Sequence, residues 1–206
     1  MNVKLIQATN EPVKRIAEIA SICYDSSPKD PLKLVEHLYR NGHHSVFEHI
    51  YFTFKIEGIS RACSHQLVRH RMCSFTQRSQ RYCSEEDFTI APVRTIYEKD
   101  KELIYYDTMD AIDNCYKKLQ ALGVPNEDAR YVLPNACCTD LFLSCNLREL
   151  IHICNERLCC KAQWEIRELV QKIVALVDSE LQFMLVPKCK SGRIICNTPC
   201  NKKEEI

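Results

Sequence analysis

The sequence predicts one α+β domain over residues 1–206, in which a mostly antiparallel sheet packs against several helices, including long C-terminal helices. Short stretches that alternate apolar and polar residues predict a few strands, whereas longer stretches with helical spacing predict helix for most of the chain. The strands do not alternate regularly with helices, as parallel βαβ units require. No internal repeat or linker divides the chain, which favours a single domain.

The N-terminal part of the chain combines helix-capping residues with one clearly alternating strand. Residues 3–8 predict a short strand, and Asn10 is predicted to cap the helix that follows. Asp30 is predicted to cap a second helix, which Gly42 ends. Residues 50–56 alternate apolar and polar side chains, and they therefore predict a strand with one buried face.

The remaining elements follow from helical spacing, alternation and capping residues. They are a helix after Ser60, a helix over 101–122 ended by Gly123, a short helical stretch from Pro125 to Arg130, a strand over 137–145, a helix capped by Asn146 and a last helix over 162–184. Residues 69–82 show too little periodicity to be assigned. The tail over 187–206 is basic and rich in cysteine, and we expect it to be loosely packed.

Composition excludes several classes of protein. The net charge of +1 predicts no nucleic-acid partner, and no apolar run reaches the length of a membrane span. Residues 1–20 contain charged side chains and no apolar signal-peptide core, so we expect a cytoplasmic protein. The chain contains only 4 glycines, and they cannot form a glycine-rich phosphate-binding loop. A bound nucleotide must therefore be held by side chains and helix ends.

The 14 cysteines indicate a reducing compartment in which most thiols are small buried hydrophobic groups. The chain has no CxxC motif, and its adjacent pairs, Cys137-Cys138 and Cys159-Cys160, do not match the usual spacing of zinc ligands. The tail cysteines could supply three ligands to a metal, so a zinc protein without catalysis stays open as an alternative: Cys189, Cys196 and Cys200. We predict no metal site.

Two polar clusters precede and follow the clearest strand. Residues 43–49 contain three histidines and Glu48, but no helical register joins these side chains. Contacts to a ligand, or a hydrogen-bonded loop at the corner between helix and strand, are therefore favoured over a metal site. Residues 69–81 contain four arginines, one histidine and no acid. Guanidinium groups suit phosphate and carboxylate ligands. One alternative is a basic surface loop, and a second is a nucleic-acid surface, which the interleaved Phe75 and Tyr82 permit.

A third cluster lies on the helix that Asn146 is predicted to cap. Arg148, His152 and Asn155 are spaced i, i+4 and i+7, and they therefore share one face, predicted opposite the apolar one. The alternative interpretation is an ordinary solvated face, but such a face favours Lys and Glu. A face of Arg, His and Asn is typical of hydrogen bonding to a ligand.

These residues resemble the motifs of the flavin-dependent thymidylate synthases. The motif Arg69-His70-Arg71, followed after seven residues by Ser79 and then by Arg81-Tyr82, resembles the signature of that family. Three further blocks resemble it in the same order: His43 to His49, Val124 to Pro134, and Asn146 to Glu165. The chain departs from the family pattern at Val46, Thr76, Gln77, Cys23 and His152, where proline, asparagine, glutamate, serine and asparagine are usual.

The resemblance implies reductive methylation of dUMP to dTMP without a cysteine nucleophile. Methylenetetrahydrofolate supplies the carbon, NADPH reduces FAD, and the enzyme is a homotetramer whose sites are built from several subunits. The alternative within this class is a related flavin and folate enzyme that acts on another pyrimidine nucleotide or makes a hydroxymethyl product.

By the same resemblance, FAD is bound by Ser45, Arg69, His70, Arg71, Gln77, Asn146, Arg148 and His152. The substrate dUMP is bound by Gln66, Arg69, Gln77, Arg78, Ser79, Gln80, Arg81, Arg130 and Arg157. Arg157, beside the uracil, is the predicted catalytic residue, because its charge could stabilise the ring when the imide ionises. Ser79 is expected to hydrogen-bond the substrate, since no base is paired with it as a nucleophile would require.

Overall fold

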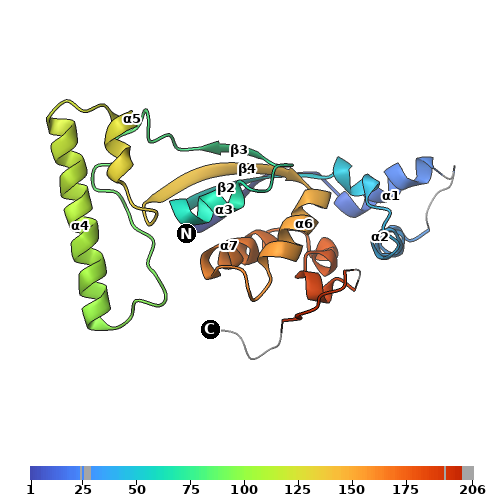
Figure 1. The fold of residues 1–206 in the computed structure, drawn as a ribbon. Coiled ribbons are helices and arrows are strands. Elements are labelled where there is room, and N and C mark those ends of the chain that lie inside the picture. The colour runs from blue at the N-terminus through green and yellow to red at the C-terminus, as the bar shows by residue number, and fades with distance from the viewer. Residues whose placement is uncertain (24, 26–28, 193, 201–206) are drawn as a thin grey trace. The chain divides into compact units, whose positions relative to one another are not determined.

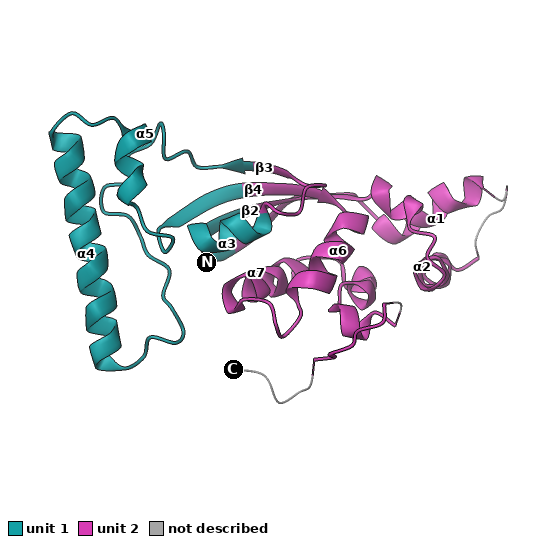
Figure 2. Ribbon diagram, viewed as in Figure 1, with its two compact units in different colours: residues 1–2, 56–67, 76–141 teal, residues 3–55, 68–75, 142–206 magenta. Residues whose placement is uncertain are grey.

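The computed structural model describes residues 1–23, 25, 29–192 and 194–200 (Figure 1). The chain divides into two compact units, each described here by itself (Figure 2). Unit 1 comprises residues 1–2, 56–67 and 76–141, and unit 2 comprises residues 3–55, 68–75 and 142–206. That residues 1–206 form one family domain stays a prediction, and the last six residues of the predicted loose tail lie outside the described residues.

Four strands form one sheet in the order β1-β2-β4-β3. Their bounds are Asn2–Ala8 for β1, Tyr51–Ser60 for β2, Ser74–Gln77 for β3 and Cys138–Asn146 for β4. The pairing of β2 with β4 is antiparallel, because Leu147 N–H donates to Ile50 O at 2.7 Å and Gly58 N–H donates to Asp140 Oδ1 at 2.8 Å. The predicted α+β class is confirmed, whereas β3 was not predicted.

The two central strands bury the faces that their alternation predicts. In β2, Phe52, Phe54 and Ile56 are buried, and in β4, Leu141 and Leu143 are buried. The short strand β3 has only four residues, none of them fully buried, so alternation was too brief to reveal it.

Unit 2 contains four α-helices and three short 3₁₀ helices among its described residues. The α-helices are α1 (Pro12–Ile22), α2 (Pro31–Arg40), α6 (Leu147–Arg157) and α7 (Trp164–Val174), and the 3₁₀ helices are η1 (Ser45–His49), η3 (Ser179–Met184) and η4 (Lys188–Lys190). The predicted cap at Asp30 is confirmed, since its carboxylate accepts from Lys33 N–H at 3.1 Å.

The predicted cap at Asn10 is wrong. The residue before α1 is Glu11, in the left-handed region with φ 45°, and its side chain makes no capping hydrogen bond. Pro12 occupies the first helical position, where its missing N–H costs nothing, and this residue sets the start of the helix.

The single last helix predicted over 162–184 is also wrong, because α7 ends at Val174. The Gln182 amide donates to Val174 O at 3.3 Å and to Val177 O at 3.0 Å, which satisfies carbonyls that a continuing helix would have used. Asp178 then caps η3 by accepting from Glu180 N–H at 2.9 Å.

Unit 1 contains α3 (Arg61–Leu67), α4 (Lys99–Ala121), α5 (Asn126–Ala129) and the 3₁₀ helix η2 (Arg130–Val132). Ser60 caps α3 as predicted, since its hydroxyl accepts from Cys63 N–H at 2.9 Å. Gly123, at φ 85°, follows α4 as predicted. In the described residues, no helix is long and apolar enough to cross a membrane.

The long helix α4 has one buried residue, Tyr116. Its hydroxyl accepts from Glu85 N–H at 3.1 Å and from the Gln120 amide at 3.2 Å. A buried N–H that loses its acceptor retains the full cost of its desolvation. The Tyr116 hydroxyl therefore ties α4 to the segment around residue 85.

We expect Tyr116→Phe to lower the free energy of unfolding by about 1 to 3 kcal/mol, because Glu85 N–H is then left without this acceptor. Urea unfolding followed by circular dichroism measures the change. Tyr106→Phe is the matched control, because Tyr106 lies on the same helix with an exposed side chain, and it should change stability by less than about 0.5 kcal/mol. Equal effects of the two substitutions would contradict the anchoring role of Tyr116.

Candidate active site

The structure places the predicted site residues in two groups, one in each unit. In unit 2 the central feature is a set of contacts among His70, which is buried, and Glu149 and Arg157, which are partly buried. Arg157 Nε donates to His70 Nε2 at 2.9 Å, and His70 Nδ1 lies 3.6 Å from Glu149 Oε1. His70 is only 5% exposed, although Arg69 and Arg71 on either side are exposed. The motif thus directs its histidine inward and its arginines outward.

The contact with Arg157 fixes the protonation of His70. A guanidinium group can only donate, so Nε2 must accept and the ring proton lies on Nδ1, which faces Glu149. Burial, the charge of Arg157 and the neighbouring His152 together lower the pKa of His70 to about 4. The ring is therefore neutral at physiological pH and can hold Arg157 without repelling it.

Glu149 completes this set from the first turn of α6. Burial raises the pKa of its carboxyl group, an effect that the nearby His152 partly opposes. The ring centroids of His70 and His152 are 5.5 Å apart and the rings are nearly perpendicular. Two imidazoles and a partly buried carboxyl group thus meet beside one arginine.

A cavity of about 660 Å³ opens in unit 2 beside these residues. Its wall combines apolar or aromatic side chains, namely Tyr39, Met72, Ile151 and Ile194, with polar ones, namely His44, Glu48, Asn146, Arg148, Glu149, His152, Asn155, Glu156 and Ser191. Of the predicted cofactor residues, this wall contains Asn146, Arg148 and His152. Apolar walls with a few convergent polar groups are typical of cofactor sites.

Asn155 supplies an unsatisfied acceptor at this cavity. Its side chain is 5% exposed and its amide donates to Ile151 O at 2.6 Å, but its Oδ1 has no hydrogen-bond partner among the described residues. A buried oxygen without a donor is costly, so a ligand N–H or O–H suits this position. We predicted Asn155 on the face of α6 opposite the apolar one; that placement is wrong, because the residue is buried with the apolar side chains.

The other predicted residues of α6 are held by local contacts. Asn146 caps the helix by accepting from Glu149 N–H at 2.9 Å, as predicted. Arg148 pairs with Glu48, which belongs to the cluster over residues 43–49. Both side chains are about half exposed, and such a pair contributes little stability, so an anionic ligand could compete for Arg148. Ser45 begins η1 and is exposed, and it is not part of the cavity wall.

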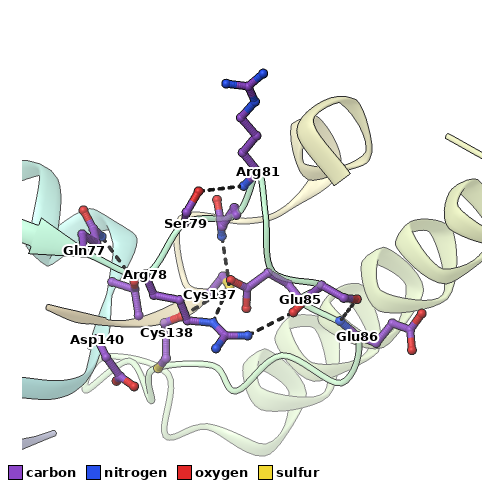
Figure 3. Close-up of polar contacts among 12 residues, drawn as sticks. Gln77, Arg78, Ser79, Arg81, Glu85, Glu86, Cys137, Cys138 and Asp140 are labelled. Atoms are coloured by element: carbon purple, nitrogen blue, oxygen red, sulfur yellow. Dashed lines mark hydrogen bonds and ion pairs between the residues drawn. The ribbon is translucent and has the colours of Figure 1, made fainter. Parts of the chain in front are cut away.

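The second group of predicted residues lies in unit 1, on the segment after β3 (Figure 3). Arg78 is turned toward its own loop: its Nε donates to Glu85 Oε1 at 3.3 Å and its Nη2 donates to Ser84 O at 3.1 Å. Glu85 is buried, so this pair is shielded more than a surface pair. Arg78 therefore organises the loop, and the dUMP contact predicted for it remains a prediction.

Gln77, Ser79 and Arg81 use their polar groups differently. The Gln77 amide donates to Ser64 Oγ at 3.1 Å and to Thr139 Oγ1 at 3.3 Å, so both partners lie in unit 1. Ser79 Oγ accepts from Arg81 N–H at 3.2 Å, and no base is paired with it in the described residues. Arg81 extends away from the other labelled residues (Figure 3), and its Nε donates to Glu127 Oε2 at 2.6 Å.

A cavity of about 360 Å³ in unit 1 brings together two of the predicted substrate residues, Gln80 and Arg130. Arg61, which sequence reasoning missed, also lines it. The Arg61 Nε is buried without a hydrogen-bond partner among the described residues, and burial lowers the pKa of this guanidinium. An unsatisfied buried donor beside Arg130 suits an anion. Gln66 lies outside this wall, and its amide donates to Ala62 O at 3.4 Å.

Comparisons of the sequence with known proteins identify the family of this chain. The sequence profile described as "Thymidylate synthase complementing protein" matches residues 4–181. A flavin-dependent thymidylate synthase of Geobacter sulfurreducens is 41% identical over 98% of this chain and 97% of its own. The enzyme of that name from Pyrococcus furiosus is 40% identical over 84% of this chain and 78% of its own.

Solved structures agree in fold. A Helicobacter pylori structure described as thymidylate synthase X with FAD and dUMP has a TM-score of 0.77 and 24% identity, covering 90% of this chain and 97% of that one. The sequence matches, the fold and the motif residues around His70 and Arg157 lead to one conclusion. The chain belongs to the thymidylate synthase complementing protein family, which includes the flavin-dependent thymidylate synthases.

Proposed function

We propose that the chain catalyses the reductive methylation of dUMP to dTMP, with FAD as cofactor, methylenetetrahydrofolate as carbon donor and NADPH as reductant. The observation that carries this proposal is the set of contacts that His70 makes with Glu149 and Arg157, beside a cavity with an unsatisfied acceptor. His70 and Arg157 lie in motifs that resemble those of the family, and the chain is 41% identical to a relative named flavin-dependent thymidylate synthase. The cytoplasmic location expected from the sequence stays part of the proposal.

The cavity of unit 2 fits FAD in its chemistry. The unpartnered Asn155 Oδ1 suits a ring N–H, and Met72 and Ile151 offer apolar contact to a flat aromatic ring system. The exposed guanidinium groups of Arg69, Arg71 and Arg148 can neutralise a pyrophosphate, which this chain cannot hold with a glycine-rich loop. FAD, when bound, supplies the reducing equivalent that converts the transferred carbon to a methyl group.

Arg157 is proposed to act on the substrate ring. Its Nε donates to His70 Nε2 at 2.9 Å, and this contact holds the guanidinium group in one orientation. A neutral His70 holds this group without adding a second positive charge. A fixed positive charge stabilises the negative charge that develops when the uracil imide ionises.

The groups of unit 1 are proposed to bind the nucleotide phosphate. Arg61 and Arg130 line one cavity with Gln80, and Arg81, which follows Gln80 in the sequence, pairs with the exposed Glu127. Ion pairs of this exposure contribute about 0 to 1 kcal/mol, so a phosphate dianion could replace Glu127 as the partner of Arg81. The roles predicted for Gln66, Gln77, Arg78 and Ser79 remain proposals.

The proposed enzyme is a homotetramer with shared sites. The best support on this chain is α4, whose 23 residues include only one that is buried. Leu103 and Ile104 are exposed on this helix, and a second subunit would cover such apolar side chains.

The buried thiols support a mechanism without a cysteine nucleophile. Burial raises the pKa of Cys137 to about 11 and the pKa of Cys154 to about 12, so both thiols are protonated at neutral pH. A protonated thiol is a poor nucleophile toward a pyrimidine ring.

The proposed function is tested by loading the purified protein with FAD and measuring its absorbance spectrum, its bleaching by NADPH, and dTMP formation from dUMP and methylenetetrahydrofolate. We expect FAD to be retained in preference to FMN, because the exposed arginines need a pyrophosphate partner. Product formation should require FAD, dUMP and the folate together. Retention of FMN over FAD, or turnover without folate, would contradict the proposal.

We expect Arg157→Lys to slow dTMP formation on the order of a hundredfold, because lysine keeps the charge but loses the planar fork and the Nε contact to His70. Bleaching of bound flavin by NADPH should change far less. Arg148→Lys is the matched control, with the opposite bias: weaker FAD retention and nearly normal turnover once loaded. Equal loss of FAD, bleaching and product in Arg157→Lys would assign Arg157 a structural role instead.

We expect Asn155→Leu to leave the apoprotein as stable as the parent or up to about 1 kcal/mol more stable, because it removes a buried unsatisfied oxygen. FAD retention should fall. Asn41→Leu is the matched control, since the Asn41 amide makes the same contact to the carbonyl four residues earlier but is exposed. Thermal unfolding and flavin content after gel filtration measure both effects. Unchanged FAD retention in Asn155→Leu would remove this residue from the cofactor site.

A further inference from the structure

Three cysteine sulfurs meet in unit 2 next to the end of α6. The Sγ atoms of Cys159, Cys160 and Cys200 all lie within 4.8 Å of one another, and each residue is partly buried. None of the 14 cysteines, all of which are described, is in a disulfide. The proposed reaction uses none of these three thiols.

The distance between two of the sulfurs is compatible with a metal site. Cys200 Sγ lies 3.9 Å from Cys159 Sγ, too far for a disulfide bond. In a tetrahedral site with zinc–sulfur distances of about 2.3 Å, two sulfurs are about 3.8 Å apart. The distance between the sulfurs of Cys159 and Cys200 is therefore close to the sulfur–sulfur distance in such a site.

Hydrogen bonds hold Cys160 and Cys200 in place although they are 40 positions apart in the sequence. Cys160 N–H donates to Cys200 Sγ at 3.2 Å. Arg167 Nη1 donates to Cys160 O at 2.9 Å, which connects the turn after α6 to α7. An N–H···S contact stabilises a sulfur that carries negative charge, as the sulfur of a metal-bound thiolate does.

The surroundings suit a cluster of thiolates. A cavity of about 240 Å³ is lined by Cys159 together with Lys161 and Lys188, whose positive charges offset those of thiolates. Cys189 and Cys196 line the same cavity, so further thiols are available for a fourth coordination position. The sequence suggested Cys189, Cys196 and Cys200 as one ligand set, whereas the structure joins Cys200 to the adjacent pair Cys159-Cys160.

We propose that Cys159, Cys160 and Cys200 bind a thiophilic divalent cation such as Zn²⁺. Each thiol loses its proton to solvent on binding, and the three thiolates occupy three positions of a tetrahedral ion. The bound ion fastens the C-terminal segment to the turn that follows Arg157. Binding energy of this kind adds to folding stability, because the unfolded chain does not present the three sulfurs together.

The test uses the full chain, purified under reducing conditions, stripped with a chelator and titrated with Zn²⁺ or Co²⁺. We expect one equivalent to bind per chain, with the near-ultraviolet charge-transfer bands of cobalt–thiolate bonds and the visible bands of tetrahedral cobalt. Zn²⁺ should raise the unfolding temperature of the reduced protein. Since loss of a residue that only supports a ligand already weakens metal binding roughly 10- to 100-fold, Cys200→Ser should weaken it by at least about a hundredfold.

Cys115→Ser is the matched control, because Cys115 is exposed on α4 and belongs to no such cluster. It should bind Zn²⁺ and Co²⁺ as the parent does. Equal affinity in Cys200→Ser and the parent would overturn the proposal, as would failure of the reduced parent to show cobalt–thiolate bands. Formation of a Cys159–Cys200 disulfide in air, with no metal binding after reduction, would assign the cluster to redox chemistry and also overturn it. None of these outcomes depends on flavin or on dTMP formation, so the proposed function is tested separately.

Discussion

The candidate cofactor site depends on Asn146, which ends β4 and caps α6. Its side-chain oxygen accepts from Glu149 N–H, while the next residue, Leu147, donates its backbone N–H to Ile50 O. These two bonds fix how the helix leaves the sheet, because they satisfy donors that a helix start otherwise leaves open. The position of this helix start therefore determines where the polar side chains of Asn146 and of α6 lie in the cavity wall. They are Asn146, Arg148, Glu149, His152, Asn155 and Glu156.

The same helix buries polar groups at a cost in stability. A neutral His70, a Glu149 carboxyl with a raised pKa and an unsatisfied Asn155 oxygen all lie within unit 2. The apolar side of α6 offsets this cost, since Leu147 and Leu150 are fully buried. Such conflicts between local stability and polar burial are typical of functional sites, where a ligand supplies the missing partners.

Two arginines of the segment after β3 pair with acidic residues of unit 1. Arg78 pairs with the buried Glu85, whereas Arg81 pairs with the exposed Glu127. The shielded pair keeps the loop in shape, and the exposed pair is weak enough to exchange its carboxylate for a phosphate. This difference divides one arginine-rich motif into a structural part and a part available to a ligand. Gln77, which replaces the usual glutamate, adds an uncharged amide that donates to two hydroxyls.

The sequence by itself determined the elements whose signals are local. The alternation over residues 50–56 and the caps at Asp30, Ser60 and Asn146 each depend on neighbours within a few residues, and the motif at His70 identified the family. Only the tertiary structure decided which distant groups meet. Strand β3 exists through pairing with β4, Asn155 is buried by packing around α6, and Cys200 reaches Cys159 across 41 positions. The physical reason is that periodicity and capping act over one or two turns, whereas burial and contact depend on long-range packing.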